Sequence, residues 1–367
     1  MKLTLIAGAR PNFMKIAPLI HAIKKHNNTS DSSPIHYRLV HTGQHYDKAM
    51  SETFFQELNI PEPNANLGCG GGTQAEQTAA IMIAFEKELI ANPADLVIVV
   101  GDVTSTMACS IVAKKLHTQV AHIEAGIRSW DLSMPEEINR MVTDSITDYF
   151  FTTSEVANQN LRNTGAKEEQ IFFVGNVMID TLLANSNRFT KPSFFDKIPL
   201  KKKEYIVLTM HRPANVDEAD KLRKLMDEIV NNVQGLPILF PIHPRTAKIF
   251  NDLGIQANNL HIVDPMGYLE FNYLVKNAKV VITDSGGITE ETTVMGVPCI
   301  TLRDNTERPE TITIGTNELI GTNPKAVQPA LEKLFSGHWK IGGIPELWDG
   351  KTAERIVEKI IEFKYKR

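Results

Sequence analysis

The sequence predicts an α/β protein of two doubly wound domains, each a parallel sheet between layers of helices. Two observations lead to this fold class. Short apolar runs rich in β-branched residues alternate with amphipathic segments along the chain, which is the pattern of parallel strands joined by crossover helices. The chain has 367 residues, more than one hydrophobic core normally fills, so two domains are expected.

The apolar runs fall into two sets along the chain. The strands expected in the first sheet are residues 3–7, 37–41, 96–101, 119–123, 149–153 and 171–175. Those expected in the second sheet are residues 205–210, 237–242, 261–264, 280–283 and 298–302. Helical segments follow most of them, for example residues 74–89, 136–147 and 221–233.

A proline-containing stretch with a lysine run, residues 190–204, separates the two sets and is typical of an interdomain connection. The expected domains are therefore residues 1–189 and 190–351. The last segment, residues 352–365, has the pattern of a long amphipathic helix and is expected to pack back on the first domain.

Composition narrows the class of protein. The net charge of -4 argues against a nucleic-acid partner, which would require a basic face. No apolar stretch reaches the roughly 18 residues of a membrane span, and the N-terminus does not have the pattern of a signal peptide. The cysteines, Cys69, Cys109 and Cys299, lack the spacing of a disulfide framework or a zinc site. We expect a cytoplasmic protein without a metal.

Polar residues at strand ends are the first candidates for a site, because doubly wound proteins bind ligands at the carboxyl ends of their strands. The first strand leads into Gly8-Ala9-Arg10-Pro11, where Gly8 permits a tight turn and Pro11 suits a helix start. Arg10 and Lys15 would then meet an anion at that helix N-terminus. A surface arginine beside an ordinary turn fits the same residues. The GxGxxG fingerprint is missing here, so no nicotinamide cofactor is expected.

Three carboxylates stand at the same predicted edge. Asp102 and Glu124 directly follow apolar strands, and Glu136 begins a helical segment in which Arg140 lies one turn later on the same face. Taken singly, Asp102 fits a helix N-cap, and Glu136 with Arg140 fits an exposed ion pair. Together they indicate acid–base chemistry, because clustered carboxylates shift one another's pKa values and so supply both an acid and a base.

The second half offers groups that suit a diphosphate. His211 follows the first strand of the second set, at its carboxyl end. Ser285, Gly286 and Gly287 stand between a later strand and a helix, where exposed backbone N–H groups bind phosphate well.

Further polar groups follow that turn. Glu291 lies a turn into the helix, where its carboxylate could accept hydrogen bonds from a ribose diol. Arg303 and Arg308 follow the next strand and are expected to pair with phosphate. We interpret the whole as a nucleoside-diphosphate site.

The motifs carrying these residues resemble a known family in their order and spacing. They read GARPNFMKIAPL, HTGQHYD, GDVTSTMA, HIEAGIRS, PEEINR, VGNVMID, TMHR, DSGGITEE and RDNTERPET. Over nearly its whole length the chain is similar to the non-hydrolysing UDP-N-acetylglucosamine 2-epimerases. The resemblance implies two Rossmann-like domains of the glycosyltransferase-B type, a homodimer, a UDP-sugar substrate and no cofactor.

The resemblance also implies roles for individual residues. The implied catalytic set is Asp102, Glu124, Glu136, Arg140 and His211. The implied UDP-binding set is Arg10, Phe271, Ser285, Gly286, Gly287, Glu291 and Arg308, to which the residue pattern adds Lys15. Gln44 and His45 fall in the motif of a candidate activator site for a second UDP-N-acetylglucosamine.

The chemistry expected from the resemblance is elimination of UDP across carbons 1 and 2 of the sugar, followed by re-addition. Asp102 and Glu136 are expected to transfer the protons, with Glu124 stabilising charge and Arg140 orienting Glu136. His211 is expected to act on the diphosphate or the sugar.

The chain departs from the family pattern in two places. Many members have threonine and glutamate where this chain has Ala9 and Asn12, and Arg-Glu-Asn where it has residues 213–215. These departures keep open the C2 epimerisation of a 2,3-diacetamido uronic acid nucleotide. A hydrolysing epimerase, a glycosyltransferase of the same fold and a UDP-sugar sensor are further functions that the sequence leaves open.

Overall fold

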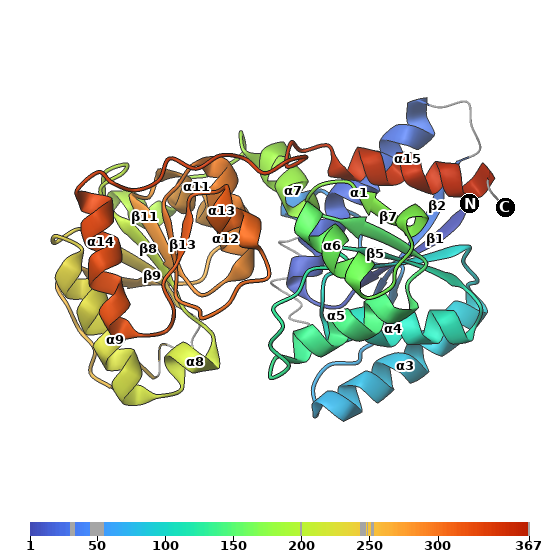
Figure 1. The fold of residues 1–367 in the computed structure, drawn as a ribbon, viewed down its shortest axis with the longest axis horizontal. Helices are drawn as coiled ribbons and strands as arrows, with labels where there is room; N and C mark the ends of the chain where they lie inside the picture. The colour runs from blue at the N-terminus through green and yellow to red at the C-terminus, as the bar shows by residue number, and fades with distance from the viewer. Residues whose placement is uncertain are drawn as a thin grey trace. The chain divides into compact units, whose positions relative to one another are not determined.

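The computed structural model describes residues 1–29, 34–44, 55–198, 200–242, 247, 249–250 and 253–365. The chain divides into two compact units (Figure 1). Unit 1 comprises Met1–Ala184 and Glu346–Arg367, and unit 2 comprises Asn185–Pro345. The end of the chain therefore returns to the unit that contains its beginning.

Unit 1 is built on a parallel sheet. Among the described residues it has seven strands in the order β3-β2-β1-β4-β5-β6-β7. They are β1 (Lys2–Ala7), β2 (His36–His41), β3 (Ala65–Asn66), β4 (Leu96–Val100), β5 (Gln119–Ile123), β6 (Tyr149–Thr152) and β7 (Ile171–Phe173). Every residue of β4 is buried, as expected of a central strand covered by helices on both faces.

Helices cover both faces of this sheet. They are α1 (Arg10–Thr29), α3 (Gln74–Ala91), α4 (Thr104–Lys115), α5 (Pro135–Ile146), α6 (Glu155–Asn163), α7 (Val177–Asn185) and α15 (Thr352–Tyr365), with a 3-10 turn at Glu168–Gln170. Helices α1 and α15 pack side by side, as do α3 with α4 and α4 with α5 (Figure 1). The capping box of Thr73 and Glu76 fixes the start of α3.

Unit 2 repeats the architecture. Its described residues form a six-stranded parallel sheet in the order β10-β9-β8-β11-β12-β13. The strands are β8 (Ile206–Thr209), β9 (Ile238–Pro241), β10 (Leu260–Val263), β11 (Val280–Thr283), β12 (Cys299–Thr301) and β13 (Asn317–Leu319). The helices are α8 (Pro213–Val216), α9 (Ala219–Asn232), α11 (Tyr268–Asn277), α12 (Gly286–Met295), α13 (Pro309–Thr313) and α14 (Val327–Phe335), with 3-10 turns at Ser193–Asp196 and Pro324–Ala326.

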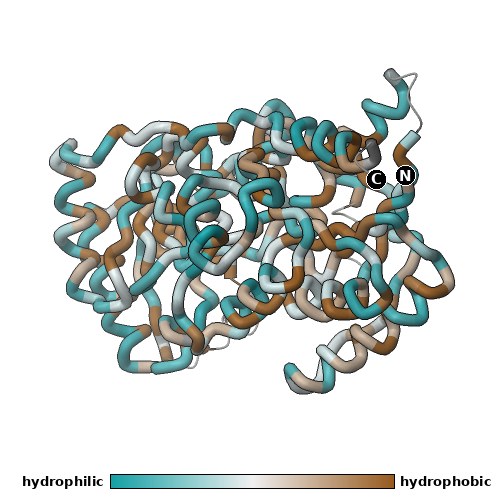
Figure 2. Tube along the Cα trace, turned by 45° about the vertical axis from the view of Figure 1, so that its right-hand side comes forward, coloured by the Kyte–Doolittle hydropathy of each residue, from teal (hydrophilic) through white to brown (hydrophobic). Residues whose placement is uncertain are grey.

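The predicted fold class is confirmed, since both sheets are parallel and doubly wound. Hydrophobic stretches alternate with hydrophilic ones along the chain (Figure 2), and this alternation is what made the longer strands recognisable. The short edge strands β3 and β13 were not predicted, because two or three residues are too few for a periodic pattern. None of the helices in the described ranges is long and apolar enough to cross a membrane.

The terminal helix α15 is attached to unit 1 by a buried carboxylate. Asp180, in α7, accepts hydrogen bonds from the backbone N–H groups of Thr352 (3.1 Å) and Ala353 (2.7 Å) at the first turn of α15. Trp348, just before that helix, is buried and donates to the carbonyl of Thr153 (3.0 Å). These bonds satisfy donors that a helix N-terminus otherwise leaves without partners.

Replacing Asp180 with alanine should therefore loosen α15. We expect the free energy of unfolding to fall by about 1–3 kcal/mol, because two buried N–H groups lose their acceptor. Hydrogen–deuterium exchange of the α15 amides and thermal unfolding measure the effect. Glu354→Ala is the matched control, since it removes only an exposed ion pair with Lys25 and should cost less than about 1 kcal/mol. Equal effects of the two changes would contradict the assigned role.

Candidate active site

In each unit the strand order reverses at one place, and the predicted site residues stand beside it. The reversal lies between β1 and β4 in unit 1, and between β8 and β11 in unit 2. Doubly wound proteins bind ligands beyond the carboxyl ends of the strands at such a reversal. Asp102 comes shortly after β4, His211 shortly after β8, and Ser285 shortly after β11. Each unit is described separately below.

The loop after β1 is fixed by Asn12. Its side-chain oxygen accepts hydrogen bonds from the backbone N–H groups of Gly8 (3.0 Å) and Ala9 (2.9 Å), and its amide donates to the carbonyl of Val100 (3.1 Å). A buried asparagine therefore joins the ends of β1 and β4. Arg10 is the first residue of α1, and its side chain lies outside the description.

Lys15, in α1, contacts the carboxylate of Glu124. Its ammonium group forms an ion pair with Glu124, whose side chain is only 1% exposed at the end of β5. The sequence suggested that Lys15 would bind a ligand anion together with Arg10. In the structure Lys15 is paired with a catalytic candidate, and its binding of a ligand anion stays a prediction.

The backbone around Glu124 is unusual. Glu124 has a φ of 71°, a left-handed conformation that is costly for a residue with a side chain. Gly101, just before Asp102, has a φ of 69°, and a Cβ there would lie 3.0 Å from the Lys15 ammonium and 3.2 Å from a Glu124 carboxylate oxygen. Glycine at this position thus makes room for the ion pair.

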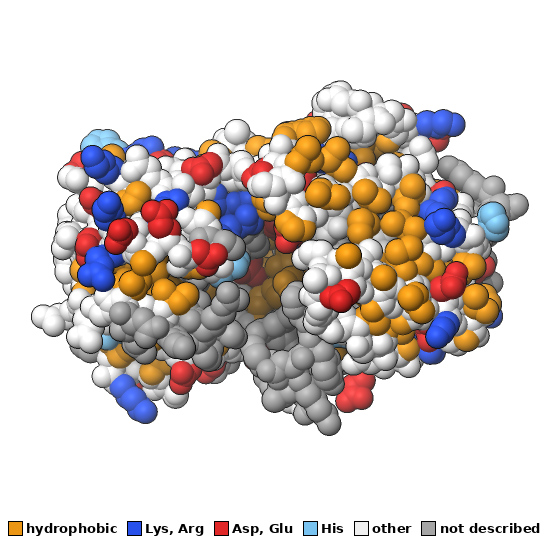
Figure 3. All heavy atoms as spheres, turned by 90° about the horizontal axis from the view of Figure 1, so that it is seen from below, with side chains coloured by type: hydrophobic (Ala, Val, Ile, Leu, Met, Phe, Trp, Pro, Cys, Tyr) orange, Lys and Arg blue, Asp and Glu red, His pale blue; other side chains and the backbone are white. Residues whose placement is uncertain are grey.

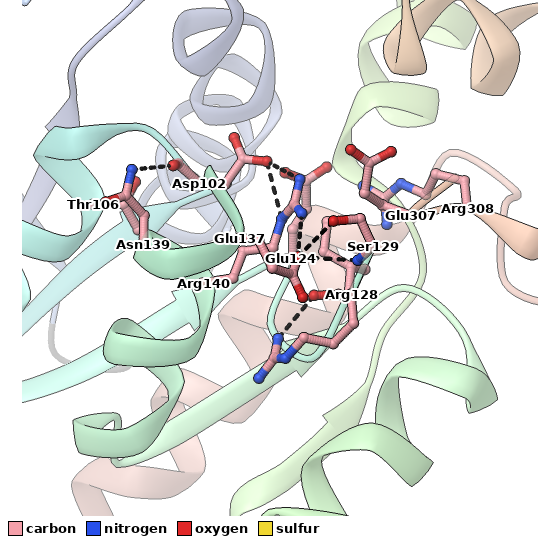
Figure 4. Close-up of polar contacts among 12 residues, drawn as sticks. Asp102, Thr106, Glu124, Arg128, Ser129, Glu137, Asn139, Arg140, Glu307 and Arg308 are labelled. Carbon is pink, nitrogen blue, oxygen red and sulfur yellow. Dashed lines mark hydrogen bonds and ion pairs between the residues drawn. The ribbon is translucent and has the colours of Figure 1, made fainter. Parts of the chain in front are cut away.

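Arg140 lies between two carboxylates (Figure 4). Its guanidinium donates to the same oxygen of Asp102 from two nitrogens, at 3.1 and 2.5 Å, and to Glu137 at 2.6 Å. The Asn139 amide also donates to the backbone carbonyl of Asp102 (2.9 Å). Asp102 is thereby held at its backbone and its side chain from one helix, α5.

The sequence predicted that Arg140 orients Glu136, but the ion-pair partner of Arg140 on its own helix is Glu137. Glu137 is fully buried and also accepts hydrogen bonds from Ser129 and the backbone N–H of Trp130. Residues 137, 140 and 144 form the buried stripe of α5, whereas Glu136 is half-buried beside it. Glutamates three and four residues before an arginine are both its neighbours, so the sequence did not distinguish them.

A buried charged cluster below this edge was not predicted. Asp144 accepts from His122 (2.7 Å), Arg128 (2.7 Å) and the backbone N–H of Gly126 (3.0 Å), while the other ring nitrogen of His122 contacts the carbonyl of Gly101 (2.8 Å). Burial by itself would raise the pKa of Asp144, but the charges of His122 and Arg128 outweigh it and lower the pKa. The signal in the sequence was an aspartate one turn after Arg140, which fits an ordinary helix equally well.

The candidate activator residues are only partly described. Gln44 is buried, and its side-chain oxygen accepts from the backbone N–H (3.2 Å) and the hydroxyl (2.8 Å) of Ser105, at the start of α4. A ligand would therefore meet the amide nitrogen of Gln44 rather than its oxygen. His45 lies outside the described residues.

In unit 2, Asp284 orients His211. Nδ1 of His211 lies 2.8 Å from the Asp284 carboxylate, which also accepts from the backbone N–H of Arg212 (2.9 Å) and from the Asn215 amide (3.1 Å). Burial would raise the pKa of Asp284, but the bonds from His211 and Arg212 lower it overall. The His211 side chain is 64% exposed, so Nε2 is the ring atom available to a ligand.

The predicted phosphate turn has the expected form. Ser285 is the N-cap of α12, and Gly286 and Gly287 form its first turn, all three half-buried. Arg303 lies beside the turn, since a Cβ on Gly286 would be 3.7 Å from its guanidinium. That guanidinium is held by Glu307 through two hydrogen bonds of 2.8 and 2.9 Å.

The remaining candidates of unit 2 lie on and around α12. Arg308 donates to Glu290 at 2.6 Å, and both are buried. Glu291 accepts from the Tyr268 hydroxyl (2.9 Å), and burial raises the pKa of Glu291 to about 7. Phe271, implied to bind UDP, is half-buried in α11 and packs against a hydrophobic core cluster.

Known proteins are similar to this chain over its whole length. The family model described as UDP-N-acetylglucosamine 2-epimerase matches residues 27–361. A UDP-N-acetylglucosamine 2-epimerase of Methanocaldococcus jannaschii is 41% identical, covering 100% of both chains. A UDP-2,3-diacetamido-2,3-dideoxy-D-glucuronate 2-epimerase of Pseudomonas aeruginosa is 40% identical, covering 98% of this chain and 99% of that one.

A solved structure shares the fold as well. The crystal structure of the M. jannaschii UDP-GlcNAc 2-epimerase in complex with UDP-GlcNAc and UDP superposes with a TM-score of 0.88 at 40% identity, covering 99% of this chain and 100% of that one. The parallel doubly wound sheets, the motifs at their strand ends and this full-length similarity agree. The chain belongs to the UDP-N-acetylglucosamine 2-epimerase family.

Proposed function

We propose that this protein interconverts UDP-N-acetylglucosamine and UDP-N-acetylmannosamine by inverting carbon 2 of the sugar, without hydrolysis. The observation that carries the proposal is the edge of unit 1, where Asp102 and Glu124 follow the neighbouring strands β4 and β5 and each is paired with a cation. Inversion needs a base and an acid at one sugar carbon, and this edge supplies carboxylates for both. The UDP-GlcNAc complex of the archaeal relative supports the same substrate.

The hydrogen on carbon 2 of the sugar is only weakly acidic, because no carbonyl is attached to that carbon. Its removal is therefore the difficult step of the reaction. In the proposed route a base removes the carbon 2 proton while the bond between carbon 1 and the diphosphate oxygen breaks. The electron pair of the C–H bond becomes the double bond of a glycal, and UDP leaves with the pair of the C–O bond. Re-addition returns a proton to the opposite face of carbon 2 and rejoins the diphosphate oxygen to carbon 1.

The residues of unit 1 would divide this work. Asp102, whose carboxylate is held by Arg140, would remove or return the proton. Glu136, half-buried on α5, would serve the opposite face. Glu124, held by Lys15, would stabilise positive charge that develops on the sugar ring.

The residues of unit 2 would hold and activate the leaving group. The N-terminus of α12 at residues 285–287 offers backbone N–H groups to the diphosphate, and Arg308 offers a guanidinium. Glu291 would accept from the ribose, and His211, oriented by Asp284, would donate to the departing phosphate oxygen. The protein would need no added cofactor, because the same UDP leaves and returns.

A related sugar is the second candidate. The P. aeruginosa relative named for UDP-2,3-diacetamido-2,3-dideoxy-D-glucuronate is about as similar to this chain as the archaeal one. Its sugar carries a carboxylate, which would require an additional cation. Beside the strand ends that carry Asp102 and Glu124, the described cations Lys15, Arg128 and Arg140 are already paired with acids, which favours the neutral sugar.

We also propose a homodimer that works in the cytoplasm. Its interface would be an apolar surface of unit 1, formed by Ile83 and Ile90 on α3 and by Ile138 and Met141 on α5, which are 40–62% exposed. The members of each pair share a helix face, and Figure 3 shows apolar side chains gathered over unit 1. A large exposed apolar patch commonly marks an interface. The three cysteines are free and buried, which fits a reducing compartment.

The reaction is tested by proton NMR of the protein with UDP-N-acetylglucosamine in D2O. We expect UDP-N-acetylmannosamine with deuterium at carbon 2. Free N-acetylmannosamine with UDP would indicate a hydrolysing enzyme instead. If there is no exchange, the diacetamido uronate nucleotide is tried next, and its turnover would identify the second candidate.

Substitutions of Glu136 and Glu137 should have different effects, one on the rate in this assay and the other on the stability of the fold. Glu136→Gln is expected to lower kcat about 10²–10⁴-fold at unchanged thermal stability, because a proton-transfer group is lost from a half-buried position. Glu137→Gln is expected to lower the free energy of unfolding by about 1–3 kcal/mol, because buried partners lose a charged acceptor. The opposite pattern would assign proton transfer to Glu137.

The interface is tested by light scattering on Ile83→Glu combined with Ile90→Glu. Two carboxylates buried at an interface without partners should shift the protein from dimer to monomer. Ile341→Glu is the matched control, since Ile341 is 94% exposed in unit 2 and its substitution should leave the mass unchanged. A monomeric wild type, or a double variant that stays dimeric, would refute this interface.

A further inference from the structure

Unit 2 contains a buried acid to which the proposed function gives no role. Glu310 is the second residue of α13, directly after the loop that carries Arg303 and Arg308, and only 4% of it is exposed. Among the described residues, no other residue gives either carboxyl oxygen of Glu310 a hydrogen-bond partner. An ionised carboxylate in such a place would have only its own backbone N–H to offset its removal from water.

The charged groups around Glu310 include those expected to meet the diphosphate. Arg308 attracts a negative charge on Glu310, and Glu290, on α12, repels it. Arg308 already donates to Glu290 at 2.6 Å, and the neighbouring Glu291 is held by Tyr268. Burial is the largest effect and raises the pKa of Glu310 to about 7, so the acid changes charge near neutral pH.

The net charge of Arg308, Glu290 and Glu310 together depends on whether Glu310 carries its proton. With Glu310 neutral, the charges of Arg308 and Glu290 sum to zero. With Glu310 ionised, the charges of Arg308, Glu290 and Glu310 sum to a net negative charge. The diphosphate then approaches a net negative charge in a buried setting, where Coulomb repulsion is poorly screened.

We propose that Glu310 is a positioning residue for the diphosphate: in its neutral form it leaves Arg308 able to bind the nucleotide, and its ionisation opposes binding. The inference rests on the proposed function, because it requires a UDP-sugar at Arg308. By linkage, binding of the nucleotide then favours uptake of a proton by Glu310. Affinity is highest at low pH and falls as the pH rises through about 7.

The test is the affinity for UDP-N-acetylglucosamine, measured by calorimetry at several values between about pH 6 and pH 9. This nucleotide is suitable because its diphosphate is a diester whose charge does not change in that range. For the wild type we expect a loss of about tenfold in affinity over the range, equivalent to a coupling of about one pK unit. For Glu310→Gln we expect the low-pH affinity at every pH, because glutamine imitates the neutral acid.

A matched control variant and the direction in which affinity changes with pH distinguish Glu310 from other groups. Glu332→Gln, an exposed change on α14 of the same unit, should keep the wild-type profile. An affinity that rises with pH would assign the linkage to Glu291, since a ribose diol favours its ionised form, and would overturn the proposal. A fall that persists in Glu310→Gln would assign it to another group, such as His211, and would overturn it too.

Two outcomes separate this inference from the proposed function. Binding and epimerisation with a flat wild-type profile overturn the inference alone, and this measurement does not depend on how well the variant folds. A wild type that does not bind UDP-N-acetylglucosamine at any pH overturns the proposed function, and the inference with it.

Discussion

The carboxylate of Asp144 is the group on which the geometry of the unit 1 edge depends. It binds Gly126, two residues after Glu124, and His122, whose other nitrogen contacts the carbonyl of Gly101, one residue before Asp102. One buried anion on α5 therefore fixes the backbone beside both catalytic candidates. Glu124 keeps a left-handed backbone at this edge, and such strain persists only where the surroundings determine it.

The same cluster explains how several acids are accommodated in a small space. One ring nitrogen of His122 contacts the Asp144 carboxylate and the other contacts the carbonyl of Gly101, so both are occupied within the cluster. Each acid at this edge has a basic partner: Glu124 pairs with Lys15, Asp102 and Glu137 pair with Arg140, and Asp144 pairs with Arg128 and His122. Buried charges are tolerated when they are paired and hydrogen-bonded in this way. Glu136 stands outside these pairs of described residues, which suits a group that must gain and lose a proton.

Features that depend on neighbouring residues in the sequence could be predicted, whereas contacts between distant residues could not. The longer strands were recognisable because a buried parallel strand is a run of apolar residues, and strand ends then indicated Asp102, Glu124, His211 and Ser285. The pairing of Arg140 with Glu137 was not recognisable, because consecutive glutamates are both within reach of an arginine on a helix. The ion pair of Lys15 with Glu124 and the cluster around Asp144 were not predicted, for another reason. The partners of Lys15 and Asp144 lie 109 and 22 residues away, and only the fold brings them together.

Each unit contains a histidine paired with an aspartate, and the two histidines differ in how deeply they are buried. In unit 1 His122 binds Asp144 and is wholly buried, so its second nitrogen is fixed on a backbone carbonyl and its proton cannot pass to a ligand. In unit 2 His211 binds the buried Asp284, but its side chain is 64% exposed and Nε2 remains available. His122 lies within β5 and His211 follows β8, and both are paired with an aspartate. Whether the second ring nitrogen is available to a ligand therefore depends on what covers it, which is a property of the folded unit rather than of either residue.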